Sequence, residues 1–333
     1  MNISVRKYNN KDENDWDEFV KYSENGTIFH LRKFLSYHID RNFKDHSLIF
    51  NKKGKIIAIL SGTILKEKKS LIFNSHPGAS YGGFIYKKLT FNDCQNIINI
   101  FEQYLYNKKI HHIRFVPTPS IYSTLFDETL DYALIWNNYK ITENYISSII
   151  PIKNDIQSNL EIIYKLKNRS KNYFEKLIKK GNISFKWNND FHTFYPILLE
   201  NKKRHYSKPT HTLEELIKLE KLMPNSLHLL LVYSDNIPIG GTLIFIANKN
   251  VGIIFYNMID YKFYNFQPAT LQMIESIKWG KKRKLKYLDF GVSQNPKAKD
   301  PTTPSKSLIK FKEESGAFVC IRKTFQKKIN NTK

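Results

Sequence analysis

The sequence predicts an α/β fold in which two similar lobes follow one another along the chain. Its 333 residues suit two domains better than one, and a hydrophobic content of 41% is enough for two cores. Each half repeats the order hairpin, strand, helix, strand, which indicates an internal duplication. Strands that alternate with helices are typical of α/β layers. We therefore expect mixed sheets flanked by helices, with an N-terminal lobe over residues 1–150, a C-terminal lobe over 151–316, and a C-terminal strand or tail over 317–333 that can return to the first lobe.

The first half begins with helical patterns and continues mainly with strands. Apolar residues at helical spacing mark the first helices, namely Trp16, Phe19 and Val20, and then Leu31, Phe34 and Leu35. The elements that follow are a hairpin of strands 47–50 and 55–65 around the turn 51–54, a strand at 70–74, a glycine-rich loop at 75–83, a helix at 91–108 and a strand at 111–117. Glycines and small residues let a backbone approach a ligand closely. His76 in this loop is therefore a candidate substrate contact, with a histidine that packs the loop as the alternative.

The second half repeats this order after a long insertion. Its elements are a hairpin of strands 227–233 and 239–247 around the turn 234–236, a strand at 251–258, a helix at 267–282 and a strand at 285–290. The insertion covers 151–224. We expect it to contain one helix over 160–181 and a second helix that Thr212 caps.

The net charge of +23 indicates an anionic partner, since 53 basic residues face only 30 acidic ones. Partners of the right charge are tRNA, nucleotide-sugar diphosphates and an acidic membrane face. The expected helix at 160–181 concentrates this charge on a surface of nearly one sign, which solvated helices usually avoid. Lys165 and Arg169 on that surface are therefore candidates for binding an anionic donor. The alternative is background lysine in a sequence that is rich in Lys, Asn and Ile.

Several classes of protein are not expected. The sequence has no run of 18 or more apolar residues, which argues against a membrane span, and its first residues carry no apolar signal core. Cys94 and Cys320 are too few for a four-thiolate zinc site, and His205 and His211 lack the spacing of metal ligands. We expect no metal and a cytoplasmic protein, with a peripheral place at the inner face of the membrane left open, as is the oligomeric state.

A lysine near the end of the second lobe is the main catalytic candidate. An apolar run at 287–290 predicts a buried strand, and 292–307 predicts a loop. Lys312 follows, directly after Phe311, and a partly buried cation there suits the tetrahedral oxyanion of acyl transfer. An ordinary surface lysine is the alternative. Asp289, at the end of the strand, is a candidate base, and a structural carboxylate bonded to loop amides is its alternative.

These motifs, in this order, resemble the Fem family of aminoacyl- and acyltransferases, which belongs to the GNAT superfamily. The segments that carry the resemblance are Tyr287-Leu288-Asp289-Phe290-Gly291, Phe311-Lys312 with Gly316, Gln267-Pro268-Ala269-Thr270-Leu271, Asn168-Arg169-Ser170 through Lys179-Lys180-Gly181, and Asn25-Gly26-Thr27-Ile28-Phe29-His30. They span nearly the whole chain. The resemblance implies two tandem GNAT-like lobes, that is, lobes of the acyl-CoA N-acyltransferase kind.

The resemblance also implies a reaction and residues for it. Family members transfer an aminoacyl group from tRNA, or an acyl group from a coenzyme A thioester, to an amine on a cell-envelope precursor such as a peptidoglycan peptide. No permanently bound cofactor is implied. By this likeness Lys312 stabilises the transition state beside Phe311, and Tyr256 is a substrate-cleft tyrosine. Arg204, with Tyr206 close by, is expected to bind a nucleotide diphosphate.

Two departures from the family pattern keep other functions open. Val116 stands where the peptidoglycan enzymes tend to carry an aspartate. The pyrophosphate loop of ordinary GNAT enzymes is missing. Its place is occupied by Tyr264-Asn265-Phe266-Gln267-Pro268-Ala269, where backbone amides at a helix N-terminus, near Gln267 and Ala269, can still meet phosphate. One alternative is a CoA-dependent N-acetyltransferase that acts on a nucleotide-linked amino sugar or another small amine. The other is a non-catalytic, nucleic-acid-binding protein with a GNAT-like scaffold.

Overall fold

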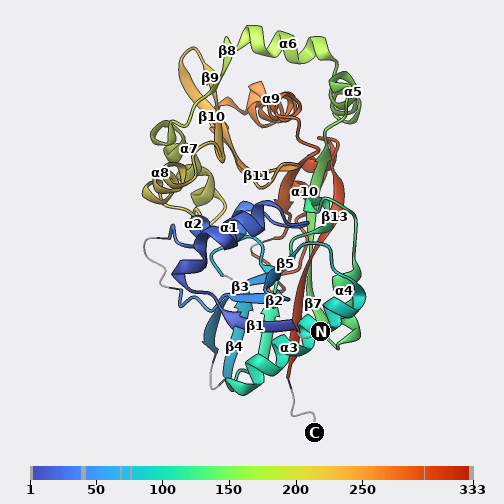
Figure 1. Cartoon of the computed structure of the whole chain (residues 1–333). Helices are drawn as coiled ribbons and strands as arrows, with labels where there is room; N and C mark the ends of the chain where they lie inside the picture. The colour runs from blue at the N-terminus through green and yellow to red at the C-terminus, as the bar shows by residue number, and fades with distance from the viewer. Residues whose placement is uncertain (1–2, 39–42, 68–69, 76, 296, 330–333) are drawn as a thin grey trace. The chain divides into compact units, whose positions relative to one another are not determined.

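The computed structural model describes residues 3–38, 43–67, 70–75, 77–295 and 297–329 (Figure 1). His76, a candidate substrate contact, lies outside these residues. The chain divides into two compact units, Met1–Tyr145 with Ile321–Lys333, and Ile146–Cys320. Within the described part of the chain, every helix is too short or too polar to cross a lipid bilayer.

The first unit is built on a sheet with the strand order β1-β2-β3-β4-β6-β13, and β5 pairs with β3 beside this path. The strands are β1 (Ile3–Lys7), β2 (Leu48–Lys52), β3 (Lys55–Glu67), β4 (Ser70–Ser75), β5 (Gly83–Tyr86), β6 (His112–Phe115) and β13 (Phe318–Lys328). The helices are α1 (Glu13–Lys21), α2 (Arg32–Leu35), α3 (Phe91–Asn107) and α4 (Thr129–Trp136), with short 3-10 turns at Asn10–Asp12, Ile28–His30 and Ser120–Tyr122. β4 and β6 are parallel, and the chain between them includes α3.

α3 shows why this part of the sequence folds as predicted. Thr90 precedes the helix and accepts a hydrogen bond from the backbone of Asp93, which completes a capping box. The apolar residues at helical spacing are buried in the core of the first unit, as the pattern predicted; they include Ile97, Ile98, Phe101 and Leu105. The predicted helix at 91–108 is therefore confirmed to within one residue.

The second unit contains a sheet with the strand order β7-β12-β11-β10-β9-β8. The strands are β7 (Lys140–Pro151, which starts in the first unit), β8 (Ile183–Trp187), β9 (Leu227–Ser234), β10 (Ile237–Ile246), β11 (Val251–Ile259) and β12 (Tyr287–Val292). The helices are α5 (Ile156–Leu166), α6 (Lys171–Lys180), α7 (Phe191–Arg204), α8 (Leu213–Leu222), α9 (Pro268–Lys282) and α10 (Lys306–Glu313), with a 3-10 segment at Tyr261–Phe266. β11 and β12 are parallel, and α9 connects them. This unit thus repeats the connection of two parallel strands through a long helix.

α9 is the central helix of the second unit and packs against β10 and β11 (Figure 1). It begins with Pro268 at its first position. Proline lacks a backbone N–H, and an N–H at this position would have no partner within the helix. Its apolar side, which includes Leu271, Ile274 and Ile277, is buried in the core of this unit. The predicted helix at 267–282 is confirmed to within one residue.

Two predicted elements need correction. The single helix expected over 160–181 is two helices, α5 and α6, because Asn168 adopts a left-handed φ of 49° and Ser170 caps α6 through the backbone N–H of Tyr173. The predicted loop over 292–307 is also too long, since α10 begins at Lys306. Lys312 consequently lies in the last turn of a helix.

Candidate active site

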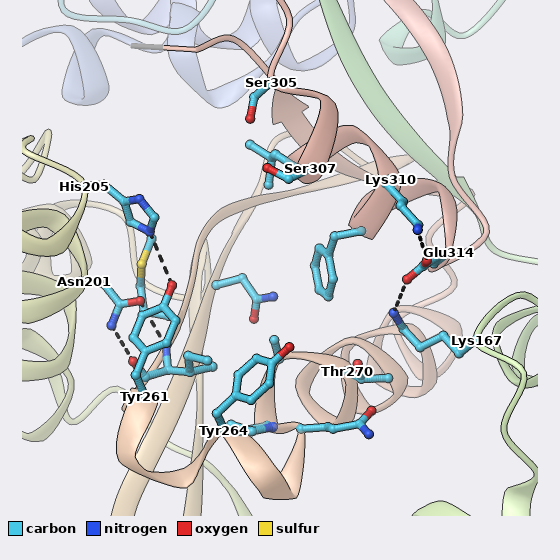
Figure 2. Close-up of a pocket in the computed structure, with 18 of the residues that line it drawn as sticks. Lys167, Asn201, His205, Tyr261, Tyr264, Thr270, Ser305, Ser307, Lys310 and Glu314 are labelled. Carbon is cyan, nitrogen blue, oxygen red and sulfur yellow. Dashed lines mark hydrogen bonds and ion pairs between the residues drawn. The ribbon is translucent and has the colours of Figure 1, made fainter. Parts of the chain in front are cut away.

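A cavity of about 1150 Å³ lies within the second unit and is the candidate active site (Figure 2). Five parts of the unit supply its described lining: the junction of α5 and α6, the end of α7, the end of β11 with the turn after it, the start of α9, and α10 with the loop before it. In Figure 2, Asn201, His205 and Tyr261 face Lys310, Glu314 and Lys167 across this space, with Thr270 and Tyr264 below and Ser305 and Ser307 above.

The cavity forms where β11 and β12 separate. The two strands are paired from Val251 with Tyr287 to Ile253 with Asp289, and no pairing continues beyond that point in the described residues. A bulge follows at Phe255, since Leu243 pairs with Tyr256 and the next residue of β10 pairs with Ile254. The residues of β11 beyond the bulge, Asn257, Met258 and Ile259, line the cavity.

A side chain from α7 replaces the missing strand at the far end of β11. Asn201 Nδ2 donates to the carbonyl oxygen of Ile259 at 2.5 Å, and the backbone N–H of Ile259 faces Asn201 Oδ1 at 3.4 Å. An amide side chain carries one donor group and one acceptor, so it can satisfy a peptide group as a neighbouring strand would. The backbone N–H and C=O of Ile259 therefore have hydrogen-bond partners although, among the described residues, no strand pairs with this side of β11 at that point.

The amino end of α9 forms one wall of the cavity. Gln267, Pro268, Ala269 and Thr270 all line it, and Gln267 has a left-handed φ of 50° that turns the chain into the helix. Gln267 Nε2 donates to the hydroxyl of Tyr173 at 2.7 Å, which ties this turn to α6. The first amides and the dipole of a helix favour an anion at its N-terminus. The predicted anion-binding residues Gln267 and Ala269 thus lie together at the cavity.

The lining is strongly cationic. Its basic side chains are Lys167, Arg169, Lys202, Lys297 and Lys310, and in the described lining the carboxylate is that of Glu314. Lys167 binds Glu314 at 2.9 Å and Lys310 lies 4.0 Å from it. Lys202 is partly buried, and burial lowers its pKa. Neither Lys202 nor Arg169 has a carboxylate partner in the described part of the chain, so the cavity favours an anionic ligand.

Lys312, the main catalytic candidate, is buried, with 3% of its surface exposed. Its ammonium donates to three successive carbonyl oxygens, those of Phe290 at 2.9 Å, Gly291 at 2.8 Å and Val292 at 3.1 Å. Burial lowers the pKa of Lys312 to about 8, and the nearby charge of Asp289 opposes this effect. Because an ammonium has three N–H donors, the carbonyls use its full capacity. Lys312 thereby holds the end of β12 in shape.

Asp289 makes similar contacts at the same strand end. Its carboxylate is fully buried and accepts hydrogen bonds from Ser147 Oγ at 2.8 Å and from the backbone N–H of Gly291 at 2.6 Å. Gly291 has a φ of +65°, which lets the chain turn back toward the carboxylate. These contacts match the structural alternative for Asp289.

The predicted substrate residues fall into two groups. Phe311, Arg169, Gln267 and Ala269 line the cavity. The described lining does not include Lys312, Asp289, Lys165, Tyr256, Arg204 or Tyr206. Lys165 is exposed on α5, and Lys167 two residues later reaches the cavity instead.

The residues outside the lining have other contacts. The hydroxyl of Tyr256 accepts hydrogen bonds from the backbone N–H groups of Thr210 and His211, and burial raises the pKa of Tyr256 to about 12. The guanidinium of Arg204 lies 4.1 Å from the ring centre of Tyr261. Tyr206 is 84% exposed, and the Lys297 ammonium is 4.3 Å from the centre of its ring.

Sequence reasoning missed most polar residues of the described lining, among them Asn257 and Lys202. Neighbouring residues of a strand point to opposite faces, so choosing Tyr256 selected the wrong face of β11, and Asn257 faces the cavity. Lys202 lies in a basic group that the sequence does show, but only the fold of α7 distinguishes it from the exposed Lys203.

Comparison with known proteins supports the fold. No protein-family model matches the sequence, and no curated protein matches it either. The chain is similar to the crystal structure of FemX, with a TM-score of 0.72 and 13% identity over 98% of both chains. It also resembles the C-terminal domain of a putative lysylphosphatidylglycerol synthetase from Agrobacterium fabrum, with a TM-score of 0.58 and 8% identity over 95% of this chain and 91% of that one.

A third similar structure is a tandem GNAT protein from the clavulanic acid biosynthesis pathway. Its TM-score is 0.52 and its identity 7%, over 99% of this chain and 100% of that one. Identities this low establish the fold and leave the substrates open. The chain has the Fem-like fold of two tandem GNAT lobes, as the sequence predicted.

Proposed function

We propose that the protein is an N-acyltransferase, which passes an aminoacyl or acyl group from an activated donor to an amine on a cell-envelope precursor. The observation that carries this proposal is the cavity where β11 and β12 part, with the amino end of α9 around it and with Arg169 and Lys202, for which the described residues supply no carboxylate partner. The gap between the two strands can hold the extended arm of the donor that carries the acyl group. The N-terminus of the helix, together with Arg169 and Lys202, can bind the phosphates of the donor. The likeness to FemX and to a tandem GNAT protein supports the same reaction class.

The donor is an acyl-CoA thioester or an aminoacyl-tRNA ester, since both carry phosphates and a reactive carbonyl. The acceptor amine attacks that carbonyl, a C–N bond forms, and the C–S or C–O bond breaks. The amine nitrogen loses one proton and the departing thiolate or alkoxide takes up one, so an amide and a free thiol or hydroxyl result. No permanently bound cofactor takes part. A peptidoglycan peptide is the first acceptor to test, because the sequence motifs resemble the Fem family, for which such peptides are the expected acceptors.

Lys312 and Asp289 contribute to this proposal by shaping the cavity wall. With its three donors engaged by the carbonyls of 290–292, Lys312 can reach an oxyanion only by giving up one of them. We therefore assign its main role to holding the end of β12, next to which Phe311 lines the cavity.

The test is a transfer assay with purified protein, in which labelled acyl-CoA and labelled aminoacyl-tRNA are offered with the same set of amine acceptors. We expect transfer from one donor class, and Lys202→Met should raise the KM for that donor about 10- to 150-fold, since a hydrogen bond to a charged group contributes about 1.5–3 kcal/mol. Lys203→Met is the matched control, because Lys203 is the exposed neighbour outside the described lining. RNA binding without transfer from either donor would instead favour a non-catalytic nucleic-acid-binding protein.

A further inference from the structure

A buried polar network joins β10, β11 and α9 behind the cavity. Thr242 is fully buried and pairs with Asn257 across the two strands, so both side chains lie on the face that α9 covers. The hydroxyl of Thr242 donates to Asn257 Oδ1 at 2.7 Å and lies 3.2 Å from Gln272 Oε1. Gln272, fully buried in α9, donates from Nε2 to the carbonyl oxygen of Met258 at 3.0 Å.

The shorter hydrogen bond of Thr242 indicates which end of the Asn257 amide meets the cavity. The Thr242 hydroxyl has a single proton, and its contact with Asn257 Oδ1, at 2.7 Å, is shorter than its contact with Gln272 Oε1, at 3.2 Å, so the proton is donated to Asn257. The oxygen of Asn257 is therefore turned into the protein, which leaves its NH₂ group as the donor on the cavity side. Gly240 makes the arrangement possible, because a side chain at that position would overlap the Gln272 amide.

We propose that Asn257 Nδ2 donates a hydrogen bond to the carbonyl oxygen of the acyl group that is transferred, and that Thr242 and Gln272 position it. This inference rests on the proposed acyl transfer. As the amine attacks, the π electrons of the carbonyl move onto its oxygen, and the C–S or C–O bond of the donor then breaks as the carbonyl re-forms. A preorganised amide donor lowers the energy of the charged intermediate, and its protons stay on Asn257 throughout.

The position of Asn257 suits this role better than that of Lys312. Asn257 lies beyond the bulge of β11, where the strand has left β12 and lines the cavity. The donors of Lys312 are instead directed at the three carbonyls of 290–292. Because the fully buried Thr242 holds Oδ1 of Asn257, the amide of Asn257 keeps its orientation when the ligand enters. A hydrogen-bond donor that is oriented in advance stabilises developing negative charge most effectively.

The experiment compares kcat and KM of wild type with Asn257→Asp, Thr242→Val and Thr242→Ser, using the donor that supports transfer. Asn257→Asp keeps the size, removes the N–H donor and adds a negative charge where the anionic acyl donor binds, so we expect kcat to fall about 10²- to 10³-fold and the KM for the acyl donor to rise, whereas the uncharged Thr242 variants should leave that KM nearly unchanged. Thr242→Val should lower kcat about tenfold, because Asn257 loses its orientation, and Thr242→Ser should restore most of it. A loss of stability alone would not produce this rescue together with an unchanged KM.

A second measurement does not depend on turnover. With ¹⁵N-labelled asparagine, the side-chain NH₂ signal of Asn257 should shift on binding a non-reactive ketone analogue of the donor, and should shift less in Thr242→Val. If the wild type is active and Asn257→Asp has the same kcat, the role of Asn257 is overturned and the proposed function stands. A wild type without transfer from either donor would contradict the proposed function and this role with it.

Discussion

At the scale of single residues, Lys312 is a buried lysine whose ammonium is bound by the backbone of its own unit. Its ammonium sits among the carbonyl oxygens of three consecutive residues, Phe290, Gly291 and Val292, at 2.8 to 3.1 Å. Three carbonyls that point at one place repel one another unless a cation lies between them. The lysine therefore stabilises the turn at the end of β12, from which the chain continues to Gln294 and Asn295 in the cavity lining.

Replacing this lysine should cost stability as well as activity. Lys312→Met keeps an unbranched apolar stem but leaves the three carbonyls without their donor, so we expect the free energy of unfolding to fall by about 3 kcal/mol. Urea unfolding followed by circular dichroism measures the change, and Lys310→Met, an exposed position two residues away, is the control. An unchanged unfolding midpoint would show that the three hydrogen bonds contribute little.

The same residue predicts a dependence of stability on pH. Burial lowers the pKa of Lys312 from its ordinary 10.5 to about 8 in the folded protein. Between these values the unfolded chain holds more protons than the folded one, so the free energy of unfolding rises with pH from about 8 to 10.5. The difference in this free energy between wild type and Lys312→Met should grow in favour of wild type over that window. A difference that stays constant would mean that Lys312 keeps its proton.

At the scale of elements, two glycines around α9 should respond to alanine in opposite ways. Gly280 lies inside α9, and a side chain there would meet its nearest neighbour, Ile152, at 3.5 Å, an ordinary contact. Gly280→Ala should therefore stabilise the protein by about 0.5–1 kcal/mol, through lower chain entropy in the unfolded state. Gly240→Ala should destabilise it, because the new methyl group overlaps the Gln272 amide. Thermal unfolding of both variants checks this, and two changes of the same sign would contradict the packing described here.

At the scale of the whole molecule, most of the fold follows from patterns that the sequence carries locally. Apolar periodicity gave α3 and α9, and the repeated order of elements gave the two lobes. The break between α5 and α6 was not predicted, because the apolar periodicity continues through it. Asn168 and Ser170 are nevertheless residues that favour a left-handed turn and a helix cap, respectively.

The site was harder to predict than the fold, because it depends on contacts between residues far apart in the sequence. The sequence motifs predicted Phe311, Arg169, Gln267 and Ala269 as site residues, and these four residues line the cavity. It does not show that β11 parts from β12 after Ile253. The hydrogen bonds of Lys312 to three carbonyls depend likewise on tertiary packing, which periodicity and spacing in the sequence do not reveal.

We propose above all that a phosphate-bearing acyl donor binds in the cavity where β11 and β12 part. Hydrogen–deuterium exchange with a non-reactive donor analogue, either a thioether of coenzyme A or an amide-linked aminoacyl-tRNA, tests it most directly. We predict protection at 254–259 and 266–271, the end of β11 and the start of α9, with little change at 278–286 beyond the middle of the same helix. Binding of either analogue that leaves the first two segments unprotected would contradict the claim.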